Sequence, residues 1–245
     1  MTKLGTAFLA AMVTLQVVSG LSERPAAYTT AIVVALATCA TCFAAATAGP
    51  RRAVAALAGA VAVGYMAELV GVTTGFPFGA YHYTGLLQPQ VAGVPVAVAL
   101  AWGGMGLAAH AVAAAIAAPG WRRIAAGAVA LTAWDLFLDP QMLRMGLWVW
   151  EHPGPYRDVP LTNFAGWLLV SALLMLLFER LLPTPGRALV TLYTAMAVME
   201  TVAFAAVFRP TDPLVAVTGG LAMGGLATAA WIRMRDPNRS PAWQK

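Results

Sequence analysis

Eight long apolar segments constrain this chain more than any other feature. They lie at residues 4–21, 26–48, 53–72, 93–117, 124–143, 160–182, 188–208 and 214–232. Each is close to the length of about 20 residues that a helix needs to cross the hydrocarbon core of a bilayer. Only 10% of the 245 residues are charged, whereas soluble domains carry roughly 25%. We therefore predict an all-α, polytopic membrane helix bundle with about eight transmembrane helices, forming a single integral-membrane domain over residues 1–245.

The positions of Lys and Arg agree with eight crossings. One side would hold Lys3, Arg51, Arg52, Arg122, Arg123, Arg180, Arg187, Arg233, Arg235, Arg239 and Lys245. The other side would hold only Arg24, Arg144, Arg157 and Arg209. Because Lys and Arg accumulate in cytoplasmic loops, we expect both termini in the cytoplasm and the protein in the cell membrane. The basic residues are scattered pairs rather than a patch, so no nucleic-acid partner is expected.

Three acidic side chains lie inside apolar segments: Glu68, Asp135 and Asp139. A carboxylate in hydrocarbon costs about 2.5–3.5 kcal/mol on insertion scales, so such a residue is a functional candidate by default. Asp135 and Asp139 are four residues apart and share one helix face. Repulsion and burial favour a proton on one of them, as a general acid requires. Asp135 lies deeper in the predicted span and is the stronger candidate for a functional role. Asp139 borders a loop, so a structural role, for example beside Arg144, is as compatible with its position as a functional one.

Two long loops, residues 73–92 and 144–159, follow these acids, and the predicted topology places both on the extracytoplasmic side. Loops of this length are usually functional or disordered, and their many aromatic residues disfavour disorder. Trp148 and Trp150 point the same way if the chain there is extended. The alternative explanation for the aromatic residues is an ordinary interfacial belt. An acid at the start of each loop favours a binding site instead.

A short internal repeat links the two loops. Val94-Pro95 precedes Trp102, and Val159-Pro160 precedes Trp167 with the same spacing. Each unit consists of an acid-bearing helix, an aromatic loop and a helix that starts at proline. Both units cross the membrane in the same direction, so the pattern indicates a parallel duplication, with a chance match as the rival explanation.

The remaining polar residues in or beside apolar segments have weaker signals. Asn163 lies near the start of the sixth segment. Its side chain could orient a water molecule or a carboxylate, or it could form a hydrogen bond to the backbone at the helix start. His110 stands alone among alanines and is expected to be structural. Glu200 has no motif around it, and pairing across helices is a better expectation than catalysis. Cys39 and Cys42 are expected to be a buried apolar pair rather than a redox or metal site.

An ordered set of motifs runs through the middle of the chain. Its residues are Glu68, Gly71, Thr74-Gly75-x-Pro77-Phe78-Gly79-x-Tyr81-x-Tyr83, Val94-Pro95, Trp102, Asp135, Asp139-Pro140, Trp148-x-Trp150, Tyr156 and Val159-Pro160-Leu161-x-Asn163-Phe164-x-Gly166-Trp167. This set resembles the integral-membrane carotenoid biosynthesis family, whose known members are carotenoid 1,2-hydratases, bisanhydrobacterioruberin hydratases among them. The resemblance covers residues 64–167, and the rest of the chain matches only as hydrophobic spans.

The resemblance implies hydration of the C1=C2 double bond in an acyclic carotenoid end group. Protonation at C2 gives a tertiary cation at C1, which water captures. This chemistry needs an acid, a wall of aromatic faces that tolerates a cation and one positioned water. We expect Asp135 or Glu68 to donate the proton with Asp139 as partner. We expect the substrate to contact Phe76, Phe78, Tyr81, Tyr83, Trp102, Trp148, Trp150, Tyr156, Asn163 and Trp167.

No metal or other cofactor is expected for this reaction, and the expected partners are a long apolar polyene, water and the lipid bilayer. Association with other enzymes of the carotenoid pathway is a further expectation. Two other functions stay open. Asp135-x-x-x-Asp139 is similar to the Mg²⁺-binding motifs of membrane prenyltransferases, although only Arg144 and Arg157 are candidates to bind diphosphate. The acids are also compatible with a proton relay in a transporter, or with a non-catalytic protein that binds a polyene or another lipid.

Overall fold

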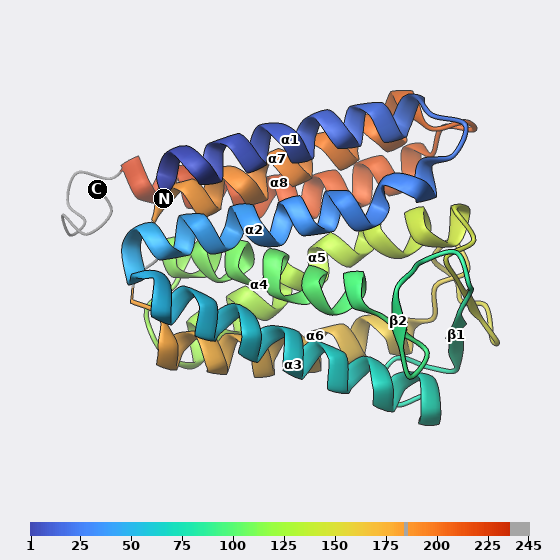
Figure 1. Ribbon diagram of the computed structural model, residues 1–245, viewed down its shortest axis with the longest axis horizontal. Helices are drawn as coiled ribbons and strands as arrows, with labels where there is room; N and C mark the ends of the chain where they lie inside the picture. The colour runs from blue at the N-terminus through green and yellow to red at the C-terminus, as the bar shows by residue number, and fades with distance from the viewer. Residues whose placement is uncertain (184–185, 236–245) are drawn as a thin grey trace.

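The computed structural model describes residues 1–183 and 186–235, so Arg239 and Lys245 lie outside the described residues. Within them the chain forms a bundle of eight α-helices (Figure 1), which confirms the predicted fold class. The helices are α1 (Thr2–Leu21), α2 (Thr29–Ala48), α3 (Pro50–Thr74), α4 (Val96–Ile116), α5 (Trp121–Arg144), α6 (Leu161–Leu181), α7 (Arg187–Val202) and α8 (Pro213–Arg235). A 3-10 turn, η1 (Pro25–Tyr28), leads into α2, and a π-helix, η2 (Ala203–Val207), follows α7.

Seven of these helices are long and apolar enough to cross a membrane when η1 is counted with α2 and η2 with α7, and α5 is the described helix that falls short. Its sequence explains the difference, because α5 carries Arg122, Arg123, Asp135, Asp139 and Arg144. Helix α5 nevertheless packs against α4, α6 and α8 within the bundle. We therefore treat it as the eighth span, which agrees with the segments predicted from the sequence.

Helix α4 is the centre of the bundle. Nearly all of its residues are buried, and it contacts α2, α3, α5, α6, α7 and α8. Its sequence is rich in Ala and Gly, which allows neighbouring backbones to approach closely, as is common between membrane helices. At Gly104 an added Cβ would lie 3.2 Å from the backbone of Ala37 in α2. This packing holds the surrounding helices, including the acid-bearing α3 and α5, in fixed positions.

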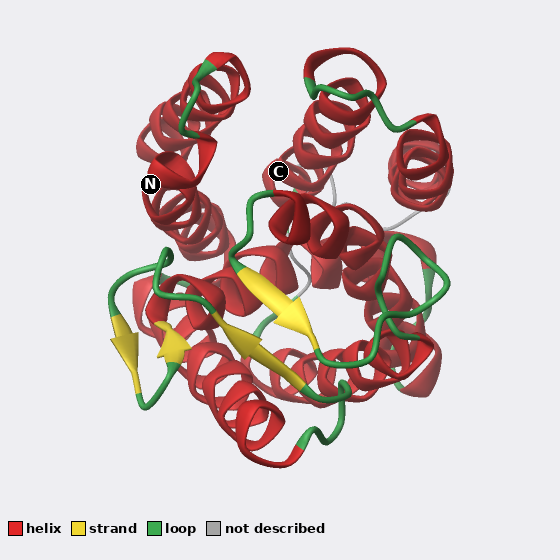
Figure 2. Ribbon diagram, turned by 90° about the vertical axis from the view of Figure 1, so that its right-hand side faces the viewer, coloured by secondary structure: helices red, strands yellow, loops and turns green. Residues whose placement is uncertain are grey.

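The two long loops meet at one end of the bundle and form short strands, which the sequence analysis did not predict. Strand β1 (Tyr81–Tyr83) pairs antiparallel with β4 (Trp148–Trp150). Strand β2 (Gln90–Val91) pairs with β3 (Val94–Pro95) just before α4. Figure 2 looks onto this end and shows the strands lying across the ends of the helices. The pairing of β1 with β4 joins segments that are more than 60 residues apart in the sequence.

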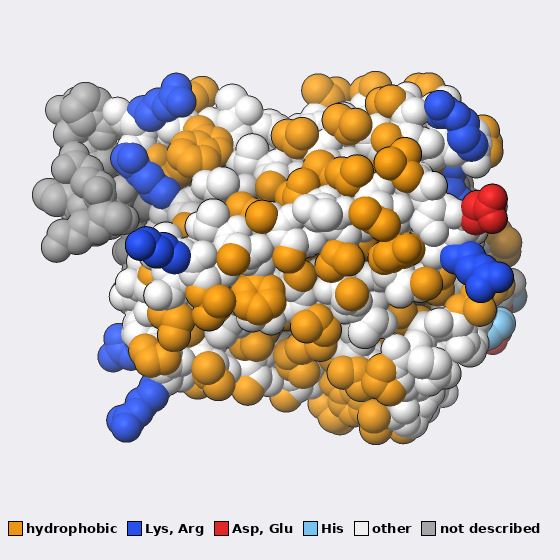
Figure 3. All heavy atoms as spheres, turned by 45° about the horizontal axis from the view of Figure 1, so that its top comes forward, with side chains coloured by type: hydrophobic (Ala, Val, Ile, Leu, Met, Phe, Trp, Pro, Cys, Tyr) orange, Lys and Arg blue, Asp and Glu red, His pale blue; other side chains and the backbone are white. Residues whose placement is uncertain are grey.

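The surface agrees with a membrane location. Hydrophobic side chains cover the middle of the face in Figure 3, and Lys and Arg side chains gather toward its two ends. The N-terminus and the α2–α3 connection lie at the end opposite the strands (Figure 1). Cys39 and Cys42 are buried free cysteines, as predicted.

Candidate active site

Glu68 is a buried acceptor for three hydrogen-bond donors. It lies on α3, where Gly64 and Gly71 share its face and leave room for Trp102 and Tyr81. The hydroxyl of Tyr81 donates a short hydrogen bond to Glu68 Oε2, and the hydroxyl of Tyr83 donates to the same oxygen at 2.7 Å. The indole of Trp102 donates to Oε1 at 2.9 Å. The carboxyl group is therefore held in one orientation by aromatic residues from β1 and α4.

Asp135 and Asp139 are joined by one amide. Asn163, at the start of α6, donates from Nδ2 to Oδ2 of Asp135 at 2.7 Å and to Oδ2 of Asp139. The indole of Trp148 donates to Asp139 Oδ1 at 2.9 Å. Oδ1 of Asp135 is buried and has no hydrogen-bond partner among the described residues. Of the two roles open for Asn163, the structure shows that it orients carboxylates.

A small cavity of about 30 Å³ lies among these groups. Glu68 and Asp139 both line it, together with Asn163. Asp135 does not, because it lies one turn deeper on α5 and reaches Asp139 through the shared amide. The sequence predicted Asp135 or Glu68 as the proton donor with Asp139 as partner, and the structure places Glu68 and Asp139 at the cavity wall.

Four aromatic residues of the paired strands cover the acids. In an antiparallel ladder, alternate side chains point to the same face. Tyr81 lies opposite Trp150, and Tyr83 lies opposite Trp148, so all four side chains share one face, while His82 and Val149 are exposed on the other. The predicted common direction of Trp148 and Trp150 is confirmed. The covering face is aromatic and carries two hydroxyl groups toward Glu68.

Burial raises the pKa of both tyrosine hydroxyls, and the neighbouring Glu68 raises it further. Tyr81 and Tyr83 therefore remain protonated hydrogen-bond donors throughout the physiological pH range.

The two tryptophans of the sequence repeat stack on each other. The rings of Trp102 and Trp167 have centroids 4.0 Å apart, and both line the cavity. Phe78 completes this wall, since it packs near Trp102 and lies where Gly166 leaves space for it. The repeat thus places equivalent residues of the α3–α4 and α5–α6 units at the same site.

The structure does not bring two of the predicted substrate contacts to this cavity. Phe76 is 65% exposed and does not line it. Tyr156 bonds the Leu136 carbonyl at 2.9 Å and the hydroxyl of Thr218 at 2.7 Å, which ties the second loop to α5 and α8. Arg144 does not pair with Asp139 but lies near Asp212, a residue that the sequence analysis did not single out.

A larger apolar groove of about 290 Å³ adjoins the small cavity. Four residues line both spaces: Val98, Ala101, Leu138 and Trp148. Three of them are ordinary apolar residues of transmembrane helices, so the sequence carried no signal for their role. Trp148 also donates its hydrogen bond to Asp139, which places that carboxyl group next to the junction. Among the described residues, no group of three or more His, Cys, Asp or Glu side chains is arranged to hold a metal ion.

Comparison with known proteins identifies the family. The family model described as "Carotenoid biosynthesis protein" matches residues 27–227. This chain belongs to the carotenoid biosynthesis protein family. The matched range of this family member includes every residue of the acid cavity described above.

A bisanhydrobacterioruberin hydratase from Haloarcula japonica is 35% identical to this family member over 134 residues. The aligned region makes up 53% of this chain and 45% of the relative, so it spans less than half of that protein. No solved structure matches.

Proposed function

We propose that this protein is a carotenoid hydratase, a hydro-lyase acting on the C1=C2 double bond of an acyclic polyene end group. The observation that carries the proposal is the junction between the two spaces. An acid cavity lined by aromatic side chains opens beside an apolar groove, and Trp148 borders both while bonding Asp139. The name of the Haloarcula relative supports the same reaction class.

The two spaces suit the two reactants. A cavity needs roughly 10–15 Å³ to hold one water molecule, and the acid cavity has about 30 Å³. The groove is lined mainly by apolar side chains and is large enough for the end of a polyene. In our proposal, water occupies the small cavity and the double bond lies at the junction.

We assign the proton transfer to Asp139. Each of its oxygens accepts a single hydrogen bond, from Trp148 or Asn163, so each keeps a second lone pair for a proton. Asp139 protonates C2, the π electrons form the new C–H bond, and the positive charge develops at C1. Asp135, joined to Asp139 through Asn163, acts as a positioning residue.

We assign the deprotonation of the attacking water molecule to Glu68. Its carboxylate is fixed by three donors and faces the same cavity as Asp139. It accepts the proton that water loses when its oxygen bonds C1, and proton return to Asp139 completes the cycle. The aromatic faces stabilise the cation by about 0.5–2 kcal/mol each. Every atom of the water molecule ends in the tertiary alcohol or in the returned proton.

The proposed setting is the cell membrane, with both termini in the cytoplasm and the strand end outside. A reporter active only in the cytoplasm, fused to the C-terminus, tests this orientation. Because the polyene is insoluble in water, we also propose that neighbouring enzymes of the pathway supply it within the bilayer, which cross-linking in membranes tests.

The deciding experiment is expression in cells that make lycopene, followed by mass analysis of the pigment extract. Addition of the mass of one or two water molecules is the expected result. Addition of an isoprenoid unit that depends on Mg²⁺ would indicate a prenyltransferase. Unchanged pigment in membranes that contain the folded protein would indicate a binding or transport protein.

A further inference from the structure

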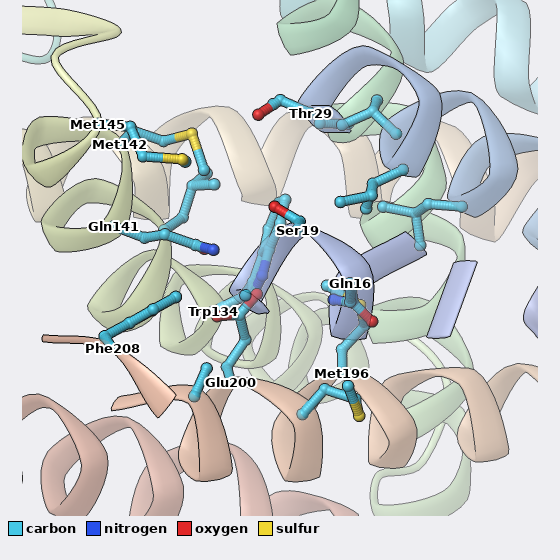
Figure 4. Close-up of a pocket in the computed structure, with 18 of the residues that line it drawn as sticks. Gln16, Ser19, Thr29, Trp134, Gln141, Met142, Met145, Met196, Glu200 and Phe208 are labelled. Atoms are coloured by element: carbon cyan, nitrogen blue, oxygen red, sulfur yellow. The ribbon is translucent and has the colours of Figure 1, made fainter. Parts of the chain in front are cut away.

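The apolar groove contains polar groups that the hydration reaction does not use. It lies between α1, α2, α4, α5 and α7 and is lined by Gln16, Trp134 and Glu200 among many apolar side chains. Figure 4 shows these three residues around the groove, with Met196 beside Gln16. The amide nitrogen of Gln16 contacts the sulfur of Met196 at 3.5 Å.

Three buried atoms of these residues have no hydrogen-bond partner among the described residues: Gln16 Oε1, Trp134 Nε1 and Glu200 Oε2. Trp134 is 3% exposed and Glu200 is 5% exposed, so bulk solvent does not satisfy them. The predicted pairing of Glu200 across helices is not found in the described part of the chain. Buried polar groups are almost always hydrogen-bonded, so a set of three in one cavity calls for a ligand.

The chemistry of these atoms defines the ligand group. The indole of Trp134 can only donate, whereas the carboxylate of Glu200 and the amide oxygen of Gln16 accept. A hydroxyl group on the ligand can satisfy a donor and an acceptor together, because it accepts a hydrogen bond from the indole and donates one to an oxygen. A carboxylate ligand would bury a second acid beside Glu200 in an apolar groove, and an ammonium group cannot accept a hydrogen bond from the indole. A pure hydrocarbon leaves all three atoms unsatisfied.

The backbone of α7 supports a binding role at this place. Helix α7 changes to the π-helix η2 three residues after Glu200, and Ala203 and Val207 of η2 line the same groove. Single π-helical turns within α-helices occur frequently at functional sites. The π-helix η2 and Glu200 therefore lie on the same wall of the groove.

The groove site is linked to the acid site through α5. Trp134 lines the groove, and its neighbour Asp135 belongs to the Asn163-bridged pair. The ring of Trp134 also contacts that of Trp167, at 6.1 Å between centroids, in an edge-to-face arrangement. One ligand extending from the groove to the junction would meet both sites.

We infer that the groove binds a hydroxyl group of the polyene, which accepts a hydrogen bond from Trp134 and donates its single proton to Glu200, so that a hydroxylated acyclic carotenoid is preferred over the hydrocarbon. This inference rests on the proposed function for the identity of the apolar chain. The reaction step itself does not require it.

The test measures binding of two probes to the full-length protein in lipid nanodiscs. The probes are lycopene and the tertiary alcohol formed by hydrating one end of lycopene, and quenching of tryptophan fluorescence reports their binding. We expect the alcohol to bind about tenfold more tightly, which is the gain from roughly one good hydrogen bond. We expect Glu200→Leu or Trp134→Phe to remove this preference while lycopene binding changes by less than about twofold.

Two further variants separate the polar contacts from general effects on the groove. Glu200→Gln keeps an acceptor oxygen and should retain part of the preference. Gln141→Leu makes a polar-to-apolar change elsewhere in the groove and should retain all of it. Equal binding of the two probes by the unmodified protein would overturn the inference, as would a preference that survives both Glu200→Leu and Trp134→Phe.

Hydration of the same probes is assayed separately, so the two proposals fail in different ways. A preference for the alcohol without addition of water to either probe would overturn the hydratase proposal and leave the hydroxyl site standing. Addition of water without any preference would do the reverse.

Discussion

Two groups of acidic side chains in the bundle differ in the residues that surround them. Glu179, toward the end opposite the strands, lies 2.8 Å from His110 and 3.3 Å from Arg123. At the strand end, Asp212 lies 2.7 Å from Arg157. Glu68, Asp135 and Asp139 form no ion pair among the described residues, and their partners are tyrosines, tryptophans and an asparagine. Acids with a cationic partner have a structural explanation, whereas acids held only by neutral donors need another one.

The difference is compatible with the proposed reaction through a cation. Preorganised charges are most effective where charge develops in the transition state and water is excluded. A resident Lys or Arg would cancel that effect at the moment when C1 becomes positive. The site therefore keeps its negative charge and protons available, whereas Glu179 and Asp212 each lie beside an Arg side chain.

The largest expected effect comes from removing the acid at the junction. Asp139→Asn keeps the shape and a hydrogen-bonding group beside Trp148 and Asn163 but removes the proton. General acid catalysis contributes typically about 10²–10⁴-fold, and we expect a loss of that size. The measurement is the initial rate of hydrated carotenoid formation in isolated membranes.

Asp212→Asn is the matched control for this experiment, because it makes the same chemical change at the same end of the bundle in an acid that has a cationic partner. It should retain activity. Equal losses of activity in the two variants would show that an acid without a cationic partner is no more important for the reaction than an acid with one.

The next largest loss of activity is expected from changing Glu68, the proposed proton acceptor in the small cavity. Glu68→Gln keeps the size of the side chain but removes the charge that draws a proton from water. We expect the rate to fall about 100-fold, as when one preorganised electrostatic group is removed. Glu179→Gln is the control at the paired acid. A Glu68→Gln variant as active as the unmodified protein would remove Glu68 from the reaction.

A smaller effect is expected from one of the donors that hold Glu68. Tyr81→Phe removes a hydrogen bond to a charged group, worth about 1.5–3 kcal/mol, so a rate loss of about tenfold or more is expected if the carboxylate is misplaced. Tyr156→Phe removes a hydroxyl that bonds elsewhere and should cost less activity. The pair compares two loop tyrosines that the sequence pattern did not distinguish.

Much of the site was predictable because its residues are chemically unusual for a membrane span. Glu68, Asp135 and Asp139 were found from the energetic cost of acids in hydrocarbon. The helices followed from apolar length, and equal spacing after Val-Pro marked Trp102 and Trp167 as corresponding residues of two repeat units, although it did not predict that they stack. These signals are local, so one sequence is enough to see them.

The rest depended on contacts between distant segments. Pairing of β1 with β4 needs register information that three-residue strands do not carry, and it decides that Tyr81 and Tyr83 face the site while His82 does not. The position of Asp139 at the cavity wall, with Asp135 behind it, could not be predicted for a similar reason. A depth estimate along one helix ignores the loop residue Trp148, which extends the site to Asp139.

The smallest effect on activity, and a distinct effect on stability, is expected at Asp212. Burial opposes its ionisation, but the hydrogen bonds from Arg157 and from the backbone of Val215, with the nearby Arg144, outweigh it and lower the pKa of this carboxyl group. A lowered folded-state pKa stabilises the protein above the unfolded-state value of about 3.9, and this contribution is lost as pH falls through the folded-state pKa.

Asp212→Asn should therefore lower the midpoint of thermal unfolding at neutral pH, by about 2–4 °C for each kcal/mol lost. The deficit should shrink as the pH falls below about 4, because the unmodified carboxyl group then also becomes neutral. Thermal unfolding of the two proteins in the same detergent, from pH 3 to pH 7, measures this. A deficit that is the same at every pH would mean that the shape of the Asp212 side chain, rather than its charge beside Arg157, holds the second loop against α8. The ion pair would then not explain why this acid is present.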